Sequence, residues 1–197
     1  ECVNDRYLMD RFLALGAGTI YTPKSTDYQR RIKEIISDFE GRDGFVSYNR
    51  TFDLNRAISR IIDEADAAMY NQQWEVAVSV LEAVATTGED IIYCGDDSAG
   101  ELGDIVRQCF EKWYELSIDD SLPPTMRSKI FELSLTHFAE GCLKGFDWWW
   151  DWIQMAIQLA DDEEKQERVI QELDKVINAK GDEWGVNYNR KEQKSRK

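Results

Sequence analysis

Apolar residues recur at steps of three and four along most of this chain, and this spacing limits its fold more than any other feature. From Thr51 onward, one predicted helix face carries Leu54, Ile58, Ile61, Ile62, Ala65 and Met69. Only three prolines interrupt the 197 residues. A period near 3.6 residues with so few breaks predicts an all-α protein.

The periodicity predicts about eight helices, most of them joined by short loops. Their expected ranges are Asp5 to Leu15, Thr26 to Phe39, Thr51 to Met69, Trp74 to Val84, Leu102 to Trp113, Pro124 to Phe138, Trp148 to Leu159 and Glu163 to Lys180. Thr26 and Gln29 are expected to cap the second helix, and Gly181 to stop the last. The inward residues expected of that last helix are Val169, Ile170, Leu173, Val176 and Ile177.

Three short segments could be strands but are assigned to loops. They are Thr19–Thr22, Phe45–Tyr48 and Ile91–Cys94. Each is only four residues long and lacks an obvious pairing partner.

The short turn Asn71-Gln72-Gln73 predicts that the helices on either side of it run antiparallel. The small and large residues of this hairpin resemble one tetratricopeptide unit, through Ala65, Ala68, Trp74, Ala77, Leu81 and Val84. We therefore expect antiparallel hairpins stacked as a tetratricopeptide-like right-handed array. It would form a single domain over residues 1–181, followed by a charged tail over residues 182–197.

Charge excludes one class of partner for the body of the protein. The formal net charge is −14, and residues 182–197 contribute +2, which leaves −16 for residues 1–181. An acidic surface repels phosphate, so direct nucleic-acid binding by the body is not expected. The basic end of the chain, Arg190–Lys197, is interpreted as a solvated, frayed tail.

The cysteines and the hydropathy indicate a cytoplasmic protein. Cys2, Cys94, Cys109 and Cys142 lie far apart and form no CxxC motif, which is typical of reduced thiols. No apolar stretch is long enough to span a membrane, and no signal peptide opens the chain. Because the first residue is Glu, we expect the chain to be a piece of a longer protein.

The acidic segment from Asp96 to Asp104 has two interpretations. A calcium or magnesium loop is one, but the alternating ligand spacing and distal glutamate of such loops are missing. The preferred interpretation is a capping box, with Ser98 as the N-cap and Glu101 reaching back to it. We therefore expect no metal ligands here.

Nothing in the sequence predicts catalysis or a cofactor. His137 is the only histidine, and it lies on an apolar helical row where a hydrogen-bonded core residue is expected. Phosphate-binding loops, dinucleotide fingerprints and nucleophile motifs are missing from the sequence. The chain is therefore interpreted as non-enzymatic.

The run Asp147-Trp148-Trp149-Trp150-Asp151-Trp152 is the most unusual stretch of the sequence. The rings could all pack against the preceding helix, or one or two could line a groove, because tryptophan is enriched at interface hot spots. Four rings rarely all bury, and Trp150 points away from the face shared by Trp148 and Trp152. Trp150 is therefore predicted to be exposed.

Two segments resemble the helical region of bacterial SWIM zinc-finger proteins. These are Gly44-Phe45-Val46-Ser47-Tyr48 and Asp96-Asp97-Ser98-Ala99-Gly100-Glu101-Leu102-Gly103-Asp104. The likeness covers about Asp27 to Ala160 and implies a tetratricopeptide-like helical array that follows a zinc finger. The CxC…CxH finger is absent from this chain, so the resemblance transfers neither zinc binding nor site residues.

The leading functional hypothesis is a protein–protein interaction or scaffolding module with a groove near Tyr70, Trp74 and Trp150. Its partner would be another protein or a peptide, and the sequence leaves the oligomeric state open. One alternative is an accessory helical domain of a zinc-finger nucleic-acid-binding protein. A divalent-metal-dependent enzyme is the remaining alternative.

Overall fold

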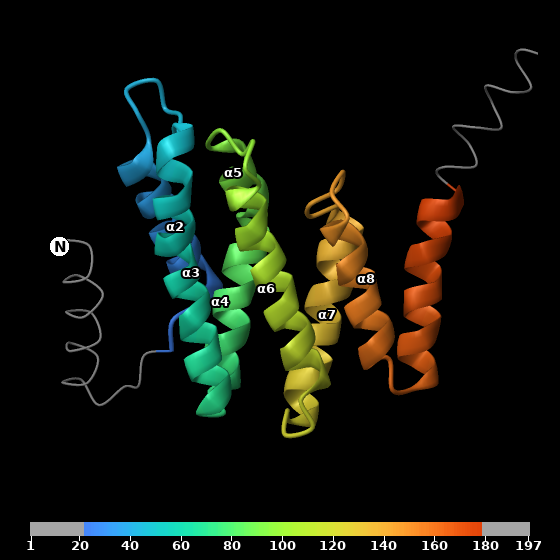
Figure 1. Cartoon of the computed structure of the whole chain (residues 1–197). Helices are drawn as coiled ribbons and strands as arrows, with labels where there is room; N and C mark the ends of the chain where they lie inside the picture. Colours follow the sequence, from blue (N-terminus) through green and yellow to red (C-terminus); the bar gives the residue numbers. More distant parts are fainter. Residues whose placement is uncertain (1–21, 179–197) are drawn as a thin grey trace, which may run out of the picture. The chain divides into compact units, whose positions relative to one another are not determined.

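The computed structural model describes residues 22–178, and within this range it is all-helical (Figure 1). The helices are α2 (Ser25–Phe39), α3 (Tyr48–Tyr70), α4 (Trp74–Thr86), α5 (Gly88–Tyr93), α6 (Glu101–Ile118), α7 (Pro124–Glu140) and α8 (Trp148–Leu159). Residues 163–178 are also helical and are called here the 163–178 helix. The expected first helix, the Gly181 stop signal and the 182–197 tail lie outside the described residues.

The chain divides into two compact units, and the division falls within α6. Unit 1 extends to Trp113 and unit 2 begins at Tyr114. Each unit is described below by itself. The tetratricopeptide-like stacking of successive hairpins stays a prediction.

Unit 1 is built around the predicted hairpin of α3 and α4. Their contacting faces bury Ile58, Ile61, Ala65 and Ala68 from α3 and Ala77, Leu81 and Val84 from α4. The turn residue Gln72 has a φ of 56°, the left-handed conformation that lets the chain reverse within three residues. Six positions were chosen from the sequence for small-to-large packing in this hairpin, and all six are buried.

Helix α2 packs against both members of this hairpin. Tyr28, Ile32 and Ile36 form its buried face. At the edges, the Gln29 amide donates to the Thr86 hydroxyl at 2.8 Å, and Arg31 pairs with Glu64 at 2.5 Å. The predicted cap by Thr26 and Gln29 is wrong, because Gln29 reaches α4 and it is Asp27 that accepts from the Lys24 backbone amide at 3.0 Å.

A short backbone pairing joins the loop before α3 to the loop after α5. The Val46 amide donates to the Cys94 carbonyl at 2.8 Å, and the Asp96 amide donates to the Val46 carbonyl at 3.1 Å. A Cβ on Gly95 would lie 2.7 Å from the Val46 carbonyl oxygen, so only glycine allows this approach. The pairing brings together the segments Gly44–Tyr48 and Asp96–Asp104. The loop predicted at Ile91–Cys94 is instead largely the end of α5.

In unit 2, α7 and α8 form the second tight hairpin. Helix α7 ends at Gly141, whose φ of 78° is the left-handed C-cap conformation. The connecting loop also holds Leu143 at φ 62° and Gly145 at φ 110°, and the Leu143 side chain is buried. The predicted helix Trp148–Leu159 is confirmed at both ends.

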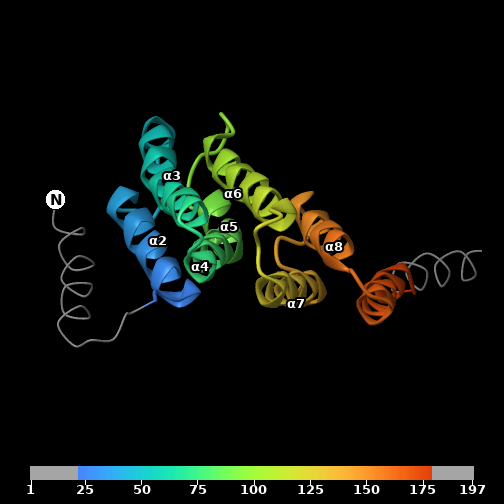
Figure 2. The same cartoon turned by 90° about the horizontal axis from the view of Figure 1, so that it is seen from below.

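The 163–178 helix lies at one edge of unit 2, with α7 and α8 both on one side of it (Figure 2). Val169 is buried as expected. Ile170 and Ile177 were predicted to face inward, but they are 57% and 64% exposed. The periodicity identified the apolar residues correctly, but it could not show that this helix has described neighbours on one side only.

Candidate functional site

The acidic segment before α6 is a helix cap, but the capping residue is Asp97 and not Ser98. The two carboxylate oxygens of Asp97 accept from the amides of Leu102 and Gly103, at 2.7 and 3.0 Å. The residue directly before the helix is Gly100, which has a φ of 80° and no side chain to cap with. Asp97 therefore reaches over the turn and satisfies first-turn amides that would otherwise lack a partner.

The predicted roles of Ser98 and Glu101 are both wrong. The Ser98 hydroxyl and amide donate to the Asp96 carboxylate, which keeps the pKa of Asp96 below its ordinary value. Ser98 is engaged with Asp96, and it is the Asp97 carboxylate that accepts from the amides of the first turn. Glu101 takes part through its backbone carbonyl, which accepts from the Asn55 amide at 2.6 Å.

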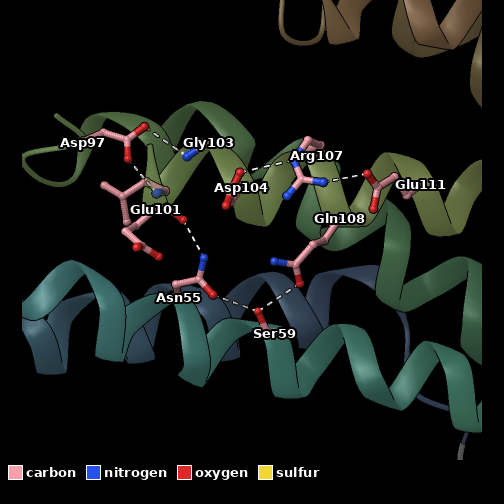
Figure 3. A network of polar contacts seen from close by, with 10 residues as sticks. Asn55, Ser59, Asp97, Glu101, Gly103, Asp104, Arg107, Gln108 and Glu111 are labelled. Carbon is pink, nitrogen blue, oxygen red and sulfur yellow. Dashed lines mark hydrogen bonds and ion pairs between the residues drawn. The ribbon is translucent and has the colours of Figure 1, made fainter. Parts of the chain in front are cut away.

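A polar network joins α3 to α6 along this start (Figure 3). The Ser59 hydroxyl lies 3.1 Å from the Asn55 side-chain oxygen and 3.2 Å from the Gln108 side-chain oxygen. On the exposed side of α6, Arg107 binds both Asp104 and Glu111. The contacts of Asn55 and Ser59 join α3 to α6, whereas the two pairs of Arg107 lie within α6.

Within residues 22–178, no three His, Cys, Asp or Glu side chains converge closely enough to hold a metal ion. The Asp97 carboxylate, the natural candidate for such a site, already accepts from two backbone amides. His137 is nearly buried, with its ring centroid 4.8 Å from that of Trp152 and its Nδ1 4.0 Å from a Glu140 oxygen.

The tryptophan run builds a rigid aromatic cluster in unit 2. The Trp149 indole N–H donates to the Phe138 carbonyl at 2.9 Å, and its ring stacks on Phe138 at 4.8 Å between centroids with a 10° interplanar angle. The Lys144 ammonium lies 5.5 Å from the Trp149 ring centroid. Trp149 and Trp152 are buried, so two of the four rings belong to the hydrophobic core.

Trp150 is the exposed member, as predicted. Its side chain is 37% exposed, while its ring centroid lies 4.8 Å from that of Trp149 and 5.9 Å from that of Phe138. Ile157 lies two helical turns further along α8 and is 52% exposed. At about 100° per residue, these two side chains point in nearly the same direction. Two exposed apolar side chains, two turns apart and with the exposed Gln154 between them, therefore lie on one side of α8.

The other two predicted contact residues lie in unit 1 and differ from each other. Tyr70 is 90% exposed at the end of α3. Trp74 is only 8% exposed, because it forms the first turn of the central helix α4. Most of the Trp74 side chain therefore belongs to the core, and its role in partner binding stays a prediction.

Unit 2 also carries a shallow groove of about 330 Å³ between α7 and the 163–178 helix. Leu135 and Ala139 contribute its apolar lining, and Glu140, Arg168 and Glu172 are among its polar residues. Arg168 is held by a bidentate pair with Glu132, at 2.5 and 2.7 Å. Sequence reasoning missed this groove, because it depends on which faces of two separate helices meet.

The supports of Trp150 were also missed. Phe138 and Lys144 contact the Trp149 ring, which lies beside Trp150. In the sequence, only the aromatic and glycine residues between Phe138 and Trp149 indicated a tight turn here.

Comparison of the chain with family models, with curated proteins and with solved structures finds no match. Among the described residues, no helix combines the length and the apolarity needed to cross a membrane.

Proposed function

We propose that this protein is a non-enzymatic protein–protein interaction module, and that it contacts its partner through the exposed face of α8 centred on Trp150. The observation that carries the proposal is the combination of exposure and rigidity at Trp150. More than a third of the side chain faces solvent, while Trp149 and Phe138 hold the ring in place.

Rigidity matters because binding costs free energy for every side chain that it immobilises. A tryptophan that is already fixed loses little conformational freedom when a partner covers it. Ile157 adds a second exposed apolar side chain two turns further along, and Asp147 and Asp151 place negative charge beside Trp150. A partner with an apolar pocket rimmed by lysine or arginine would fit this surface.

The test is affinity capture on the immobilised full chain from a lysate of the source cells, followed by titration of the recovered partner. Trp150→Ala should weaken binding by about thirtyfold, since truncation of an aromatic hot spot costs about 2 kcal/mol. Far-ultraviolet circular dichroism should stay unchanged, because α8 is anchored by Trp149, Trp152 and Ile153.

Two matched variants make the experiment specific. Tyr93→Ala removes an aromatic side chain of unit 1 that is 69% exposed, and it should bind the partner like the parent. Ile157→Ala should weaken binding by a smaller factor than Trp150→Ala. Equal binding by Trp150→Ala and the parent would refute the assignment of this surface. Tyr70→Ala tests whether the exposed end of α3 is a second contact point.

A second candidate is an accessory helical domain of a zinc-finger protein. Its support is that Val46 and Gly95 bring together the two segments on which the family resemblance rests. This candidate requires a CxC…CxH finger in the coding sequence upstream of Glu1. An upstream coding sequence without such a finger would eliminate this candidate.

A thermal-shift screen, which measures the unfolding temperature, distinguishes a metal-dependent enzyme from the interaction module. Magnesium, manganese, calcium or zinc would raise the unfolding temperature of an enzyme that holds the ion in its folded state. We expect no such increase. As part of the same proposal, we place the protein in the cytoplasm, where thiols such as that of the buried Cys109 stay reduced.

A further inference from the structure

The 163–178 helix has two apolar faces, and only one of them is covered by the described part of unit 2. On the covered face, Val169 is buried, Lys165 and Arg168 lie over the Phe131 ring, and Arg168 pairs with Glu132. These contacts fix the orientation of the helix against α7. They also determine which residues point away from it.

The open face carries Ile170, Leu173 and Ile177, spaced by three and four residues. Ile170 is 57% exposed, Ile177 is 64% exposed, and Leu173 is half-buried. Such a row is the usual contact surface for a neighbouring element. In arrays of helices, an end helix normally replaces this surface with polar residues or is covered by a further segment. Here it does neither within residues 22–178.

We propose that the open face is covered by the chain's own segment Trp184–Tyr188, which folds back antiparallel along the 163–178 helix. This segment follows the helix after only a few residues, so tethering makes its local concentration high. Its sequence is Trp184-Gly185-Val186-Asn187-Tyr188. In an extended segment alternate side chains share a side, which puts all three apolar residues on the side that faces the helix.

The register of the two segments matches. An extended chain advances about 3.3 Å per residue and a helix about 1.5 Å, so each docked residue passes roughly two helix residues. With the helix ending at Lys180 and the chain turning at Gly181, as the sequence predicts, this ratio brings Trp184 to a level between Leu173 and Ile177. Val186 then lies at the level of Ile170, and Tyr188 at the level of Glu167.

Opposite charges on the segment and on the helix extend the match beyond the apolar residues. The same spacing brings Arg190 and Lys191 to the level of Glu163 and Asp161, at the start of the helix. A second copy of the protein is a poorer occupant, because Glu163, Glu167 and Asp174 border the open face. Two such faces would bring like charges together.

Amide hydrogen exchange of the 163–178 helix tests the proposal directly. Removal of residues 182–197 from the full chain should speed exchange there by roughly tenfold, because the covering segment no longer stabilises the helix. Trp184→Ala should produce most of this effect. Removal of residues 190–197 alone should produce a smaller effect. In the full chain, 0.5 M salt should produce the same smaller effect, because it shortens the Debye length to about 4 Å and so screens the charges of the tail.

A reciprocal pair of variants identifies the face. Ile177→Asp places a charge on the open face and should speed exchange in residues 184–188. Asn178→Asp adds the same charge one residue later, about 100° around the helix, and should leave exchange in residues 184–188 unchanged.

Three results would overturn the proposal. The first is exchange in the helix that is unaffected by removal of residues 182–197. The second is an effect of that removal that Trp184→Ala fails to reproduce. The third is protection that rises with protein concentration alongside a dimeric mass, since this would assign the face to a second copy.

Discussion

Asp97 shows how a single side chain decides where a helix begins. Its carboxylate accepts from the amides of Leu102 and Gly103, two of the first-turn groups that have no partner within α6. Gly100 bends the chain between them with a φ of 80°. The carboxylate also places negative charge at the positive end of the helix, which favours the same start.

Asp97→Ala should therefore lower the free energy of unfolding by about 1–2 kcal/mol, the usual cost of losing a charged cap. Ser98→Ala, one residue along the chain, should cost clearly less, because its hydroxyl contacts only the exposed Asp96. Urea unfolding of both variants measures the difference. A larger loss for Ser98→Ala would restore the cap predicted from the sequence.

Cys94 has a thiol that resists ionisation. Burial, and after it the negative charge of Glu40, raise the pKa of Cys94 from 9.0 to about 11. At pH 8 roughly a thousandth of this thiol is thiolate, so alkylation by iodoacetamide should be slow and should accelerate tenfold per pH unit. Glu40→Gln should speed alkylation, because it lowers the Cys94 pKa.

The raised pKa of Cys94 also has a consequence for stability. Because the pKa is higher in the folded than in the unfolded state, the neutral thiol's contribution is fully present below pH 9 and is lost as the pH rises towards 11. Site-resolved mass spectrometry of native and guanidinium-unfolded protein measures the alkylation rates. Equal rates at pH 8 in the two states would contradict the assignment.

Single residues were predicted well where geometry leaves little choice. Three consecutive rings on a helix point about 100° apart, so at least one of Trp148, Trp149 and Trp150 had to face solvent. The cap of α6 offered no such constraint. Asp96, Asp97 and Ser98 are all good capping residues, and the choice among them depends on where Gly100 turns the chain.

At the scale of elements, the backbone pairing of Val46 with the loop after α5 leaves almost no space for an added side-chain atom. Gly95→Ala would place a Cβ 2.7 Å from the Val46 carbonyl oxygen and 2.9 Å from its Cβ. Both groups are fixed, so the backbone must move. We expect a loss of about 1–3 kcal/mol in the free energy of unfolding, as for other overpacked sites.

Gly41→Ala is the matched control for Gly95→Ala. Its nearest atom would be an Asp43 carboxylate oxygen at 2.8 Å, which belongs to a flexible exposed side chain and can move away. Thermal unfolding should therefore shift much less for Gly41→Ala than for Gly95→Ala. Equal shifts would show that the close approach at Gly95 is not what requires glycine.

The helices with a strong period were all predicted to exist, but α3 and α6 are longer than expected, and the surroundings of the helices were not predicted. Trp148–Leu159 matches at both ends, because Asp147 precedes a clear apolar face. Helix α5 was missed, since six residues are too few to display a helical period. Ile170 and Ile177 were placed inward, because periodicity marks an apolar face but does not count the elements that cover it.

At the scale of the whole molecule, the dominant property is a net charge of −14. The ion pairs of the structure are mostly exposed and contribute little. The excess of like charge destabilises the compact state. Urea unfolding should therefore show greater stability as ionic strength rises from about 10 mM to 150 mM, over which the Debye length falls from about 30 to 8 Å.

The same titration near pH 4.5 is the control, because the sequence pI is about 4.5 and the net repulsion disappears there. The salt effect should then vanish or change sign. Loss of stability on adding salt at pH 7 would show that the ion pairs outweigh the excess charge.

The pairing of Val46 with Gly95 also has a consequence for the order of folding. The two residues are separated by the whole of α3, α4 and α5, so closing this loop costs far more chain entropy than forming the α3–α4 hairpin. Local contacts are therefore expected to form before this pairing. If the pairing forms after the folding transition state, its loss should raise the unfolding rate and leave the folding rate nearly unchanged.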